Sequence, residues 1–309
     1  MRLRELCGFR VSEVGLGGWV VGSDLYRLDD EDARRLVNKA LDLGITLFDT
    51  ADVYGRGRSE ELLGRWLAGH DVVISTKVGY DFYHYEKPTR RFDPEYLGWA
   101  AAKSAERLGR RPDILMLHNP PADSIRKTAP WLKAQRGVLA ACVGAALGPE
   151  TYVLEEGLAA LNAGLDVVMF VFNILEQDPG MEFIKRGGGL LVRVPDATGV
   201  LTDRFSPNPT DHRSLRPREW LIKARALVER EIAPLARELG LTLAQYAVKY
   251  VLSFPVASVV VTATAPEELE EYATASDGKP LPRDHLERLE EFWRRHGATL
   301  STAPSSGGR

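Results

Sequence analysis

Short apolar runs alternate along the chain with longer segments in which charged and apolar positions recur at the spacing of a helix. The apolar runs are hydrophobic almost throughout, as strands covered on both faces are. Eight runs are predicted as strands: Val14–Gly18, Ile45–Asp49, Val72–Lys77, Ile114–His118, Val138–Val143, Val167–Phe172, Leu190–Val194 and Ser258–Thr262. The predicted helices are Asp29–Leu43, Ser59–Leu67, Pro94–Leu108, Pro149–Asn162, Arg218–Leu239, Pro266–Ala273 and, without a following strand, Leu243–Leu252 and His285–Arg295.

This alternation predicts parallel strands joined by helical crossovers. Eight such units in roughly 260 residues fit a closed (β/α)8 TIM barrel, an α/β fold. An open doubly wound sheet is the alternative. A short N-terminal hairpin is expected from Leu3–Leu6 and Arg10–Val11, and the two last helices are additions to the barrel. We therefore expect one barrel domain over residues 1–300 and a disordered tail over residues 301–309.

Composition narrows the classes of function. The 309 residues are 44% hydrophobic and 27% charged, which is ordinary globular usage. A net charge of −3 gives no basic field for nucleic acid or an anionic membrane. No apolar run approaches the ~20 residues of a membrane span. Only two cysteines, Cys7 and Cys142, are present, which favours a reducing compartment and argues against a disulfide framework, so we expect a cytoplasmic protein.

Four polar residues stand at or just after the ends of neighbouring predicted strands. Asp49 ends the second strand and Tyr54 follows it, while Lys77 and His118 end the third and fourth. Each alone has an ordinary structural explanation, but a barrel brings its strand ends to one rim, so together they predict a site. A phenol titrates near pH 10, and a neighbouring ammonium lowers that pKa. Such a set suits protonation of a carbonyl oxygen while a hydride arrives at carbon.

The stretch from Phe48 to Glu60, read Phe-Asp-Thr-Ala-Asp-Val-Tyr-Gly-Arg-Gly-Arg-Ser-Glu, closely resembles the signature of the aldo-keto reductase superfamily. Further resemblance lies in Gly15–Trp19, Ser75–Val78, Leu115–His118, Phe172–Gln177 and Ala244–Tyr250. The resemblance implies a (β/α)8 barrel that reduces aldehydes or ketones with NAD(P)H. It also implies Tyr54 as the general acid/base, Lys77 and Asp49 as its tuning pair, and His118 as the residue that orients the substrate.

The positions expected to hold the cofactor depart from this family's pattern. Where the family commonly has polar side chains for the nicotinamide amide, the chain has Gly144-Ala145 after the fifth strand and Met169 on the sixth. Ser-Pro-Leu after the seventh strand becomes Val194-Pro195-Asp196, and the asparagine that often meets adenine falls at Tyr272. The candidate cofactor-binding residues are Gly144, Ala145, Met169, Arg193, Thr262, Thr264 and Glu268.

The segment after the eighth strand bears on which dinucleotide binds. Pro266–Glu271 carries four glutamates and no basic residue. Because a 2′-phosphate carries nearly two negative charges and is bound by Arg or Lys, we expect NADH to bind at least as well as NADPH. Glu268 can bond a ribose hydroxyl, as acidic residues do in NAD sites. The alternative, that these acids only complement a helix N-terminus, stays open.

An aromatic loop, Tyr80–Tyr85, follows the third strand. Trp19, Tyr80 and Tyr83 are candidate substrate-pocket residues, and aromatic walls suit an apolar or sugar-like carbonyl compound. Packing of the loop onto the barrel is the alternative reading of these aromatics. The long irregular stretch Thr202–Arg216 is a candidate lid.

Two explanations fit an intact set of strand-end residues beside altered cofactor positions. The favoured one is a reductase that holds its dinucleotide mainly through main chain and stacking. The other is a relative with weakened or lost nicotinamide binding that serves as a binding or regulatory module. A Schiff-base lyase using Lys77 is a rival enzyme class, against which Asp49 argues because an anion keeps the amine protonated. The six histidines show neither HxH nor HExxH spacing, so no metal site is predicted.

Overall fold

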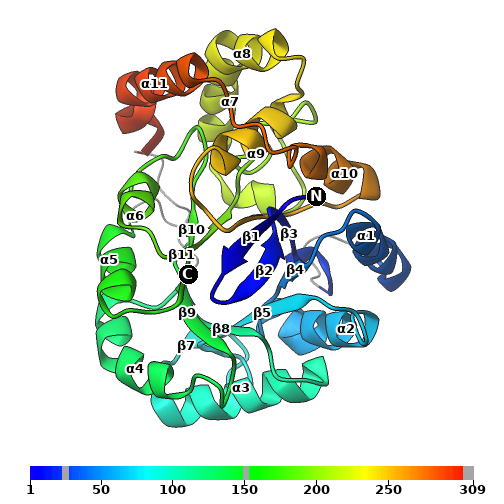
Figure 1. The fold of residues 1–309 in the computed structure, drawn as a ribbon, viewed down its shortest axis with the longest axis vertical. Helices are drawn as coiled ribbons and strands as arrows, with labels where there is room; N and C mark the ends of the chain where they lie inside the picture. The colour runs from blue at the N-terminus through cyan, green and yellow to red at the C-terminus, as the bar shows by residue number, and fades with distance from the viewer. Residues whose placement is uncertain (23–27, 149–152, 302–309) are drawn as a thin grey trace.

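The computed structural model describes residues 1–22, 28–148 and 153–301. Eight parallel strands close into a barrel, with β12 paired to β3 and β10 to β9 (Figure 1). The barrel strands are β3 (Val14–Gly17), β4 (Leu47–Asp49), β5 (Val73–Val78), β8 (Ile114–His118), β9 (Cys142–Ala146), β10 (Val167–Val171), β11 (Gly189–Arg193) and β12 (Ser258–Val261). Two antiparallel hairpins are β1 (Leu3–Leu6) with β2 (Phe9–Ser12), and β6 (Tyr80–Asp81) with β7 (Thr89–Arg90).

Helices surround the barrel (Figure 1). They are α1 (Asp30–Asp42), α2 (Arg58–Trp66), α3 (Pro94–Leu108), α4 (Ala122–Ala134), α5 (Leu154–Asn162), α6 (Gly180–Arg186), α7 (Arg218–Leu227), α8 (Ala233–Glu238), α9 (Leu243–Leu252), α10 (Pro266–Thr274) and α11 (Arg283–Ser301). The predicted (β/α)8 barrel with an N-terminal hairpin and added C-terminal helices is confirmed. None of the described helices is both long enough and apolar enough to cross a bilayer.

Local capping signals explain why α3 and α9 begin where the sequence predicts. Asp93 accepts a hydrogen bond from the N–H of Tyr96, and Pro94 occupies the first turn of α3. At the start of α9, Thr242 and Gln245 form a capping box. These interactions satisfy main-chain groups that a helix end would otherwise leave unpaired.

Several elements differ from the prediction. The fifth barrel strand begins at Cys142, because Val138 lies in the turn after α4 and donates its N–H to the carbonyl of Gln135. The pattern missed α4, which contains Pro130, and α6, which is only 7 residues long. The predicted helix start at 149–152 and the predicted tail at 302–309 lie outside the described residues, and Ser301 is the last residue of α11 rather than part of a tail.

The β1–β2 hairpin lies across one end of the barrel (Figure 1). Leu6 and Val11 from this hairpin are buried and pack against apolar side chains inside the barrel. Cys7, in the turn, forms a disulfide with Cys142 at the start of β9, with the two Cα atoms 6.4 Å apart. The expectation of no disulfide is therefore wrong. The two cysteines are 135 residues apart, and only the folding of the hairpin onto the barrel brings them together.

Alternation along the barrel strands decides which side chains reach the mouth. Val73 packs inside the barrel, and Lys77 lies on the same face of β5. Met116 and His118 likewise share the inward face of β8. The side chains at the carboxyl ends of these strands therefore converge above the apolar interior.

Candidate active site

A buried ion pair joins β4 and β5 at the barrel mouth. The Nζ atom of Lys77 donates to Oδ2 of Asp49 at 2.6 Å and to the main-chain carbonyl of Thr50 at 2.6 Å. The other oxygen of Asp49 accepts from the hydroxyl of Ser75 at 2.6 Å. Burial lowers the pKa of Lys77, but the charges of Asp49 and of an ionised Tyr54 outweigh burial and raise this pKa overall. Lys77 is thus held as an ammonium ion.

Tyr54 lies beside this pair in the loop between β4 and α2. Its ring centroid is 5.1 Å from Nζ of Lys77, and the ring of Trp19 stacks against it at 5.9 Å. The turn after Tyr54 passes through Gly55 at φ 58°, where a Cβ would lie 2.0 Å from the carbonyl oxygen of Gly22. Only glycine fits there, so this glycine allows the close approach of the two segments beside Tyr54.

His118 completes the group from the end of β8. Its ring meets the ring of Tyr54 edge-on at 5.8 Å and the ring of Tyr80 edge-on at 5.0 Å. Burial, and then the charges of Lys77 and Arg193, lower the pKa of His118 well below its usual value, so the imidazole is neutral. Its Nδ1 atom has no hydrogen-bond partner among the described residues.

The structure brings together the four predicted catalytic residues and two of the three predicted pocket residues. Trp19 contacts Tyr54, and the hydroxyl of Tyr80 accepts a hydrogen bond from the side chain of Asn119 at 3.1 Å. Tyr83 instead stacks on Phe82 at 3.9 Å and meets Trp99 edge-on at 4.7 Å. Tyr83 therefore belongs to the packing of its loop rather than to this group.

Two of the predicted cofactor positions lie in the wall of the barrel. Gly144 is paired with Val167 of β10, and a Cβ on this glycine would lie 2.2 Å from the carbonyl oxygen of Val167. Ala145 packs in the outer core, between barrel and helices. Because β9 extends to Ala146, that residue faces the interior in register with His118. Alternation turns the side chain of Ala145 away from the mouth, so among the two predicted positions only Gly144 lies on the inward face.

The remaining cofactor candidates lie along the mouth and the start of α10. Met169 is fully buried inside the barrel, and its side chain offers no hydrogen-bond donor. Arg193 ends β11 and donates from Nη2 to the carbonyl of Leu147 at 2.9 Å. Thr262 follows β12, and its hydroxyl oxygen would lie 3.7 Å from a Cβ placed on Gly17. Thr264 and Glu268, the last two candidates, form part of a polar network at α10.

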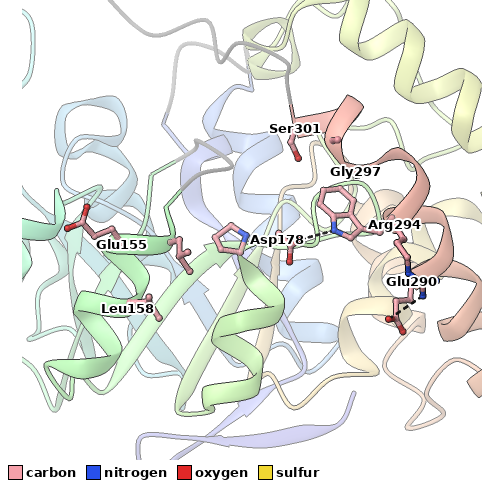
Figure 2. Close-up of a pocket in the computed structure, with 11 residues that line it drawn as sticks. Glu155, Leu158, Asp178, Glu290, Arg294, Gly297 and Ser301 are labelled. Carbon is pink, nitrogen blue, oxygen red and sulfur yellow. Dashed lines mark hydrogen bonds and ion pairs between the residues drawn. The ribbon is translucent and has the colours of Figure 1, made fainter.

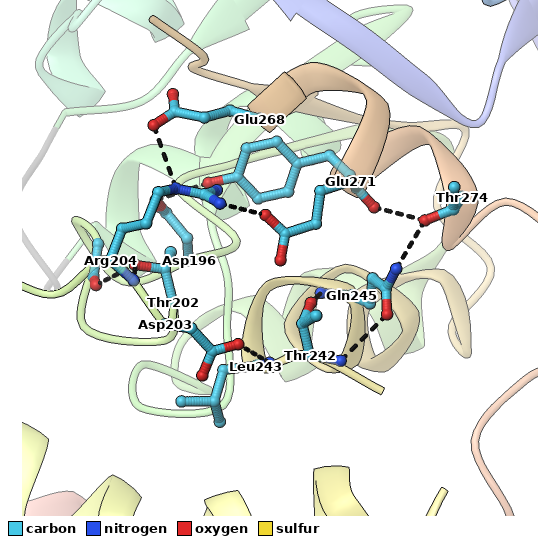
Figure 3. A network of polar contacts seen from close by, with 12 residues as sticks. Asp196, Thr202, Asp203, Arg204, Thr242, Leu243, Gln245, Glu268, Glu271 and Thr274 are labelled. Carbon is cyan, nitrogen blue, oxygen red and sulfur yellow. Dashed lines mark hydrogen bonds and ion pairs between the residues drawn. The ribbon is translucent and has the colours of Figure 1, made fainter. Parts of the chain in front are cut away.

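This network links the loop after β11 to α10 (Figure 3). Thr264 donates from its N–H and hydroxyl to Oε2 of Glu268, at 2.8 and 3.0 Å. Arg204 bridges two acids, with Nε 3.2 Å from Oε1 of Glu268 and Nη1 2.6 Å from Oε2 of Glu271. The sequence reading missed Arg204 as a site residue, although it lies within the predicted lid. Arg204 is thus shared between two carboxylates, and the charge of Arg213 also acts on Glu268.

A second contact fixes the same loop. The hydroxyl of Tyr272 donates to Oδ2 of Asp196 at 3.2 Å, and the tyrosine is 3% exposed. Burial raises the pKa of Asp196, and the hydrogen bond from Tyr272 opposes that rise without cancelling it. The polar end of Tyr272, the residue that the resemblance places where an adenine-binding asparagine is often found, is thus already bonded within the protein.

A groove of about 910 Å³ lies apart from these residues, between α5, α6 and the end of α11 (Figure 2). Leu154, Leu158 and Trp293 supply much of its apolar lining, and the indole N–H of Trp293 donates to Asp178 at 2.9 Å. None of the four predicted catalytic residues lines it. Within the described part of the chain, no cluster of His, Cys, Asp or Glu could hold a metal ion.

Comparison with known proteins identifies the family. The model of the Aldo/keto reductase family matches residues 13–294. The probable voltage-gated potassium channel subunit beta of Arabidopsis thaliana is 29% identical over 304 residues, covering 89% of this chain and 90% of that protein. The uncharacterized oxidoreductase YqkF of Bacillus subtilis (strain 168) is 28% identical over 314 residues, covering 94% and 96%. The holo form of aldo-keto reductase AKR11C1 from Bacillus halodurans shares the fold, with a TM-score of 0.77 at 24% identity over 94% of this chain and 96% of that one. The chain belongs to the aldo/keto reductase family of oxidoreductases.

Proposed function

We propose that the protein interconverts an aldehyde or ketone and the corresponding alcohol by hydride transfer, with Tyr54 as the general acid/base. The observation that carries this proposal is the buried pair of Lys77 and Asp49 beside Tyr54, with N–O distances of 2.6 Å. An ammonium ion held next to a phenol stabilises the phenolate. A phenol so placed can exchange a proton with an alcohol or carbonyl oxygen near neutral pH.

Each residue of the group has a defined role in this reaction. In the reducing direction, Tyr54 gives its proton to the substrate oxygen, and the resulting phenolate is stabilised by the Lys77 ammonium. Asp49 and the carbonyl of Thr50 fix the direction of that ammonium. His118 is neutral, so it can donate one hydrogen bond to the substrate oxygen without adding charge. A bound nicotinamide dinucleotide would supply or accept the hydride.

The residues present suit NADH better than NADPH. Members of this family typically use NAD(P)H. The cations at the acidic start of α10 are already paired, Arg204 with Glu268 and Glu271 and Lys39 with Glu270. A 2′-phosphate placed there would meet excess negative charge, whereas a ribose hydroxyl can donate to a carboxylate. Gly144, Ala146 and Met169 offer no polar side chain to the nicotinamide amide, so the grip on that ring comes from main chain and stacking.

The substrate class follows from the walls of the mouth. Trp19 and Tyr80 place flat apolar surfaces against Tyr54 and His118. Such walls suit a small apolar or sugar-like carbonyl compound.

The test is turnover of a panel of aldehydes and ketones with NADH and with NADPH, together with the Tyr54→Phe variant. We expect Tyr54→Phe to lose turnover while its melting temperature and its dissociation constant for the dinucleotide stay unchanged. Retained turnover would exclude Tyr54 as the acid. The Asp49 carboxylate 2.6 Å from Lys77 also predicts that borohydride traps no carbonyl compound on Lys77.

A non-catalytic binding or regulatory module is the second candidate. It is favoured by the apolar residues Gly144, Ala146 and Met169 and by the similarity to a protein named as a potassium channel subunit beta. A calorimetric titration with both dinucleotides, together with the turnover panel, separates the two candidates, because the module either binds neither dinucleotide or binds one without turnover.

A further inference from the structure

A second set of buried polar side chains lies behind the wall of the barrel, and the reaction above does not use it. Glu60 on α2 is fully buried, accepts from the hydroxyl of Thr76 at 2.5 Å and pairs with Arg107 of α3 at 2.7 Å. The guanidinium of Arg107 lies 5.5 Å from the ring centroid of Tyr83. Asp52, fully buried, completes the set from the loop between β4 and α2. This cluster therefore connects the catalytic loop to the helices outside β5.

Four polar atoms of this cluster are buried without a hydrogen-bond partner in the described residues. They are both carboxyl oxygens of Asp52 and the hydroxyls of Tyr83 and Tyr96. The N–H of Val53 and the guanidinium of Arg107 come close to Asp52 and Tyr83, but not in hydrogen-bonding geometry. Buried polar groups in folded proteins are nearly always bonded to protein or to ordered water. Orphan atoms on three neighbouring side chains therefore point to water between them.

Electrostatic effects indicate that these side chains share one environment. Burial, and then the charge of Asp52, raises the pKa of both Tyr83 and Tyr96. Burial, and then the charge of Glu60, raises the pKa of Asp52 well above its usual value, which Arg107 and Lys77 only partly oppose. A neutral carboxyl group can donate as well as accept, which suits a water molecule that needs partners of both kinds.

The cluster also lies between two segments that build the active site. Asp52 is two residues before Tyr54, and its N–H donates to the carbonyl of Lys77 at 3.1 Å. Tyr83 belongs to the loop of residues 79–92, which also places Tyr80 against His118. A water-mediated contact between Asp52 and Tyr83 would therefore set the position of the loop that forms one wall of the mouth.

We propose that Asp52, Tyr83 and Tyr96 enclose an internal water site that holds the loop of residues 79–92 against the catalytic loop. Asp52 is then a positioning residue for the substrate, acting through water and Tyr83. The kinetic part of this inference rests on the proposed function, whereas the water site itself does not.

The first experiment is a high-resolution crystal structure of the wild-type protein. We expect ordered water within hydrogen-bond distance of the Asp52 carboxyl group and of at least one of the two tyrosine hydroxyls. A dry cluster, or direct bonding of Asp52 to Arg107 or a tyrosine, overturns the proposal. A bound sodium or potassium ion on Asp52, with stability that depends on that ion, overturns it as well.

The second experiment measures amide hydrogen exchange in residues 79–92, a readout that needs no turnover. Asp52→Ala removes the carboxyl group, and we expect exchange there to become at least tenfold faster. Asp52→Asn keeps a group that donates and accepts, so it should restore slow exchange. Tyr83→Phe should speed exchange in the same loop, whereas Tyr85→Phe is the matched control, because Tyr85 is 53% exposed. Equal rates of amide exchange in residues 79–92 in all four variants would refute the water-mediated contact between Asp52 and Tyr83.

The third experiment separates positioning from catalysis. We expect Asp52→Ala and Tyr83→Phe to raise KM for the carbonyl substrate about tenfold, with kcat changed less than threefold and dinucleotide affinity unchanged. Asp52→Asn and Tyr85→Phe should keep the wild-type KM. An equal fall in kcat for Asp52→Ala and Asp52→Asn would contradict a role through water. Absence of any wild-type turnover would instead count against the proposed function, and the crystal structure and exchange data would still decide the water site.

Discussion

The Asp49–Lys77 pair has a structural role and a proposed catalytic role, and variants that separate these two roles test the candidate active site most directly. Lys77→Met removes the ammonium from a position that is 2% exposed. Among the described residues, it leaves the Asp49 carboxylate with Ser75 as its one side-chain hydrogen-bond partner. Breaking a buried ion pair by removing one partner typically costs ~3–5 kcal/mol. For a chain of this size that loss corresponds to a fall of roughly 5–10 °C in the melting temperature.

The double variant Asp49→Asn/Lys77→Met removes both charges together. Because no uncompensated charge then remains buried, we expect it to recover most of the stability, to within about 2 kcal/mol of wild type. Turnover should not recover, since nothing stabilises the phenolate of Tyr54. A positioned acid is worth about 10²–10⁴ in rate, so both variants should lose at least ~100-fold in kcat.

Chemical denaturation at pH 7 and single-turnover rates measure the two effects on the same samples. The pH dependence supplies an internal check. Because folding raises the pKa of Lys77, its stabilising effect is present below the ordinary lysine pKa of about 10.4 and is lost as pH rises through the higher folded value. The stability gap between wild type and Lys77→Met should therefore narrow at high pH. A double variant with wild-type turnover, or a single variant with wild-type stability, would refute the reasoning.

Three further predictions concern other parts of the molecule. Reduction of the disulfide, or Cys7→Ser, removes a covalent link between residues 135 positions apart and should lower the free energy of unfolding by up to ~5 kcal/mol. Equal unfolding curves with and without reductant would contradict this expectation. Glu268→Gln/Glu271→Gln frees Arg204 for a phosphate and should shift the NADPH-to-NADH affinity ratio, measured by titration, about tenfold toward NADPH. An unchanged ratio would contradict the proposal that these two glutamates disfavour NADPH. Because folding lowers the pKa of His118, stability should fall as pH drops below about 6.5, and His118→Gln should lose that slope in acid titrations of unfolding.

Much of the fold follows from local signals in the sequence. Strands buried on both faces stand out as apolar runs, and caps such as Asp93 at α3 fix helix ends from neighbouring residues alone. The predicted helices and strands differ from the structure where local sequence signals conflict or are absent. Pro130 argues against a helix, yet α4 continues through it. Val138–Val143 is apolar throughout, so nothing in it marks the turn that precedes β9.

The candidate site also contains contacts that the sequence predicts and contacts that it does not. The sequence predicts that Asp49, Lys77 and His118 lie close together, because parallel strands put their carboxyl ends at one rim. The sequence does not predict the contacts of Arg204 with Glu268 and Glu271, since these contacts depend on how a long loop folds back onto α10. Such pairings are set by loop conformation and leave no periodic trace in the sequence.

The two halves of the mouth follow different structural constraints. Asp49 and Lys77 are fixed by side-chain hydrogen bonds made within β4 and β5, so their geometry depends on no side chain of β9 or β10. In that wall, Gly144 cannot carry a side chain, because the carbonyl of Val167 occupies the place of its Cβ, and Met169 already fills the interior. Among these inward positions, Ala146, in register with His118, is where a polar side chain could be added. Under the proposed function, the affinity for the dinucleotide and the acid–base chemistry would be carried by separate strands, so that one could change while the other is kept.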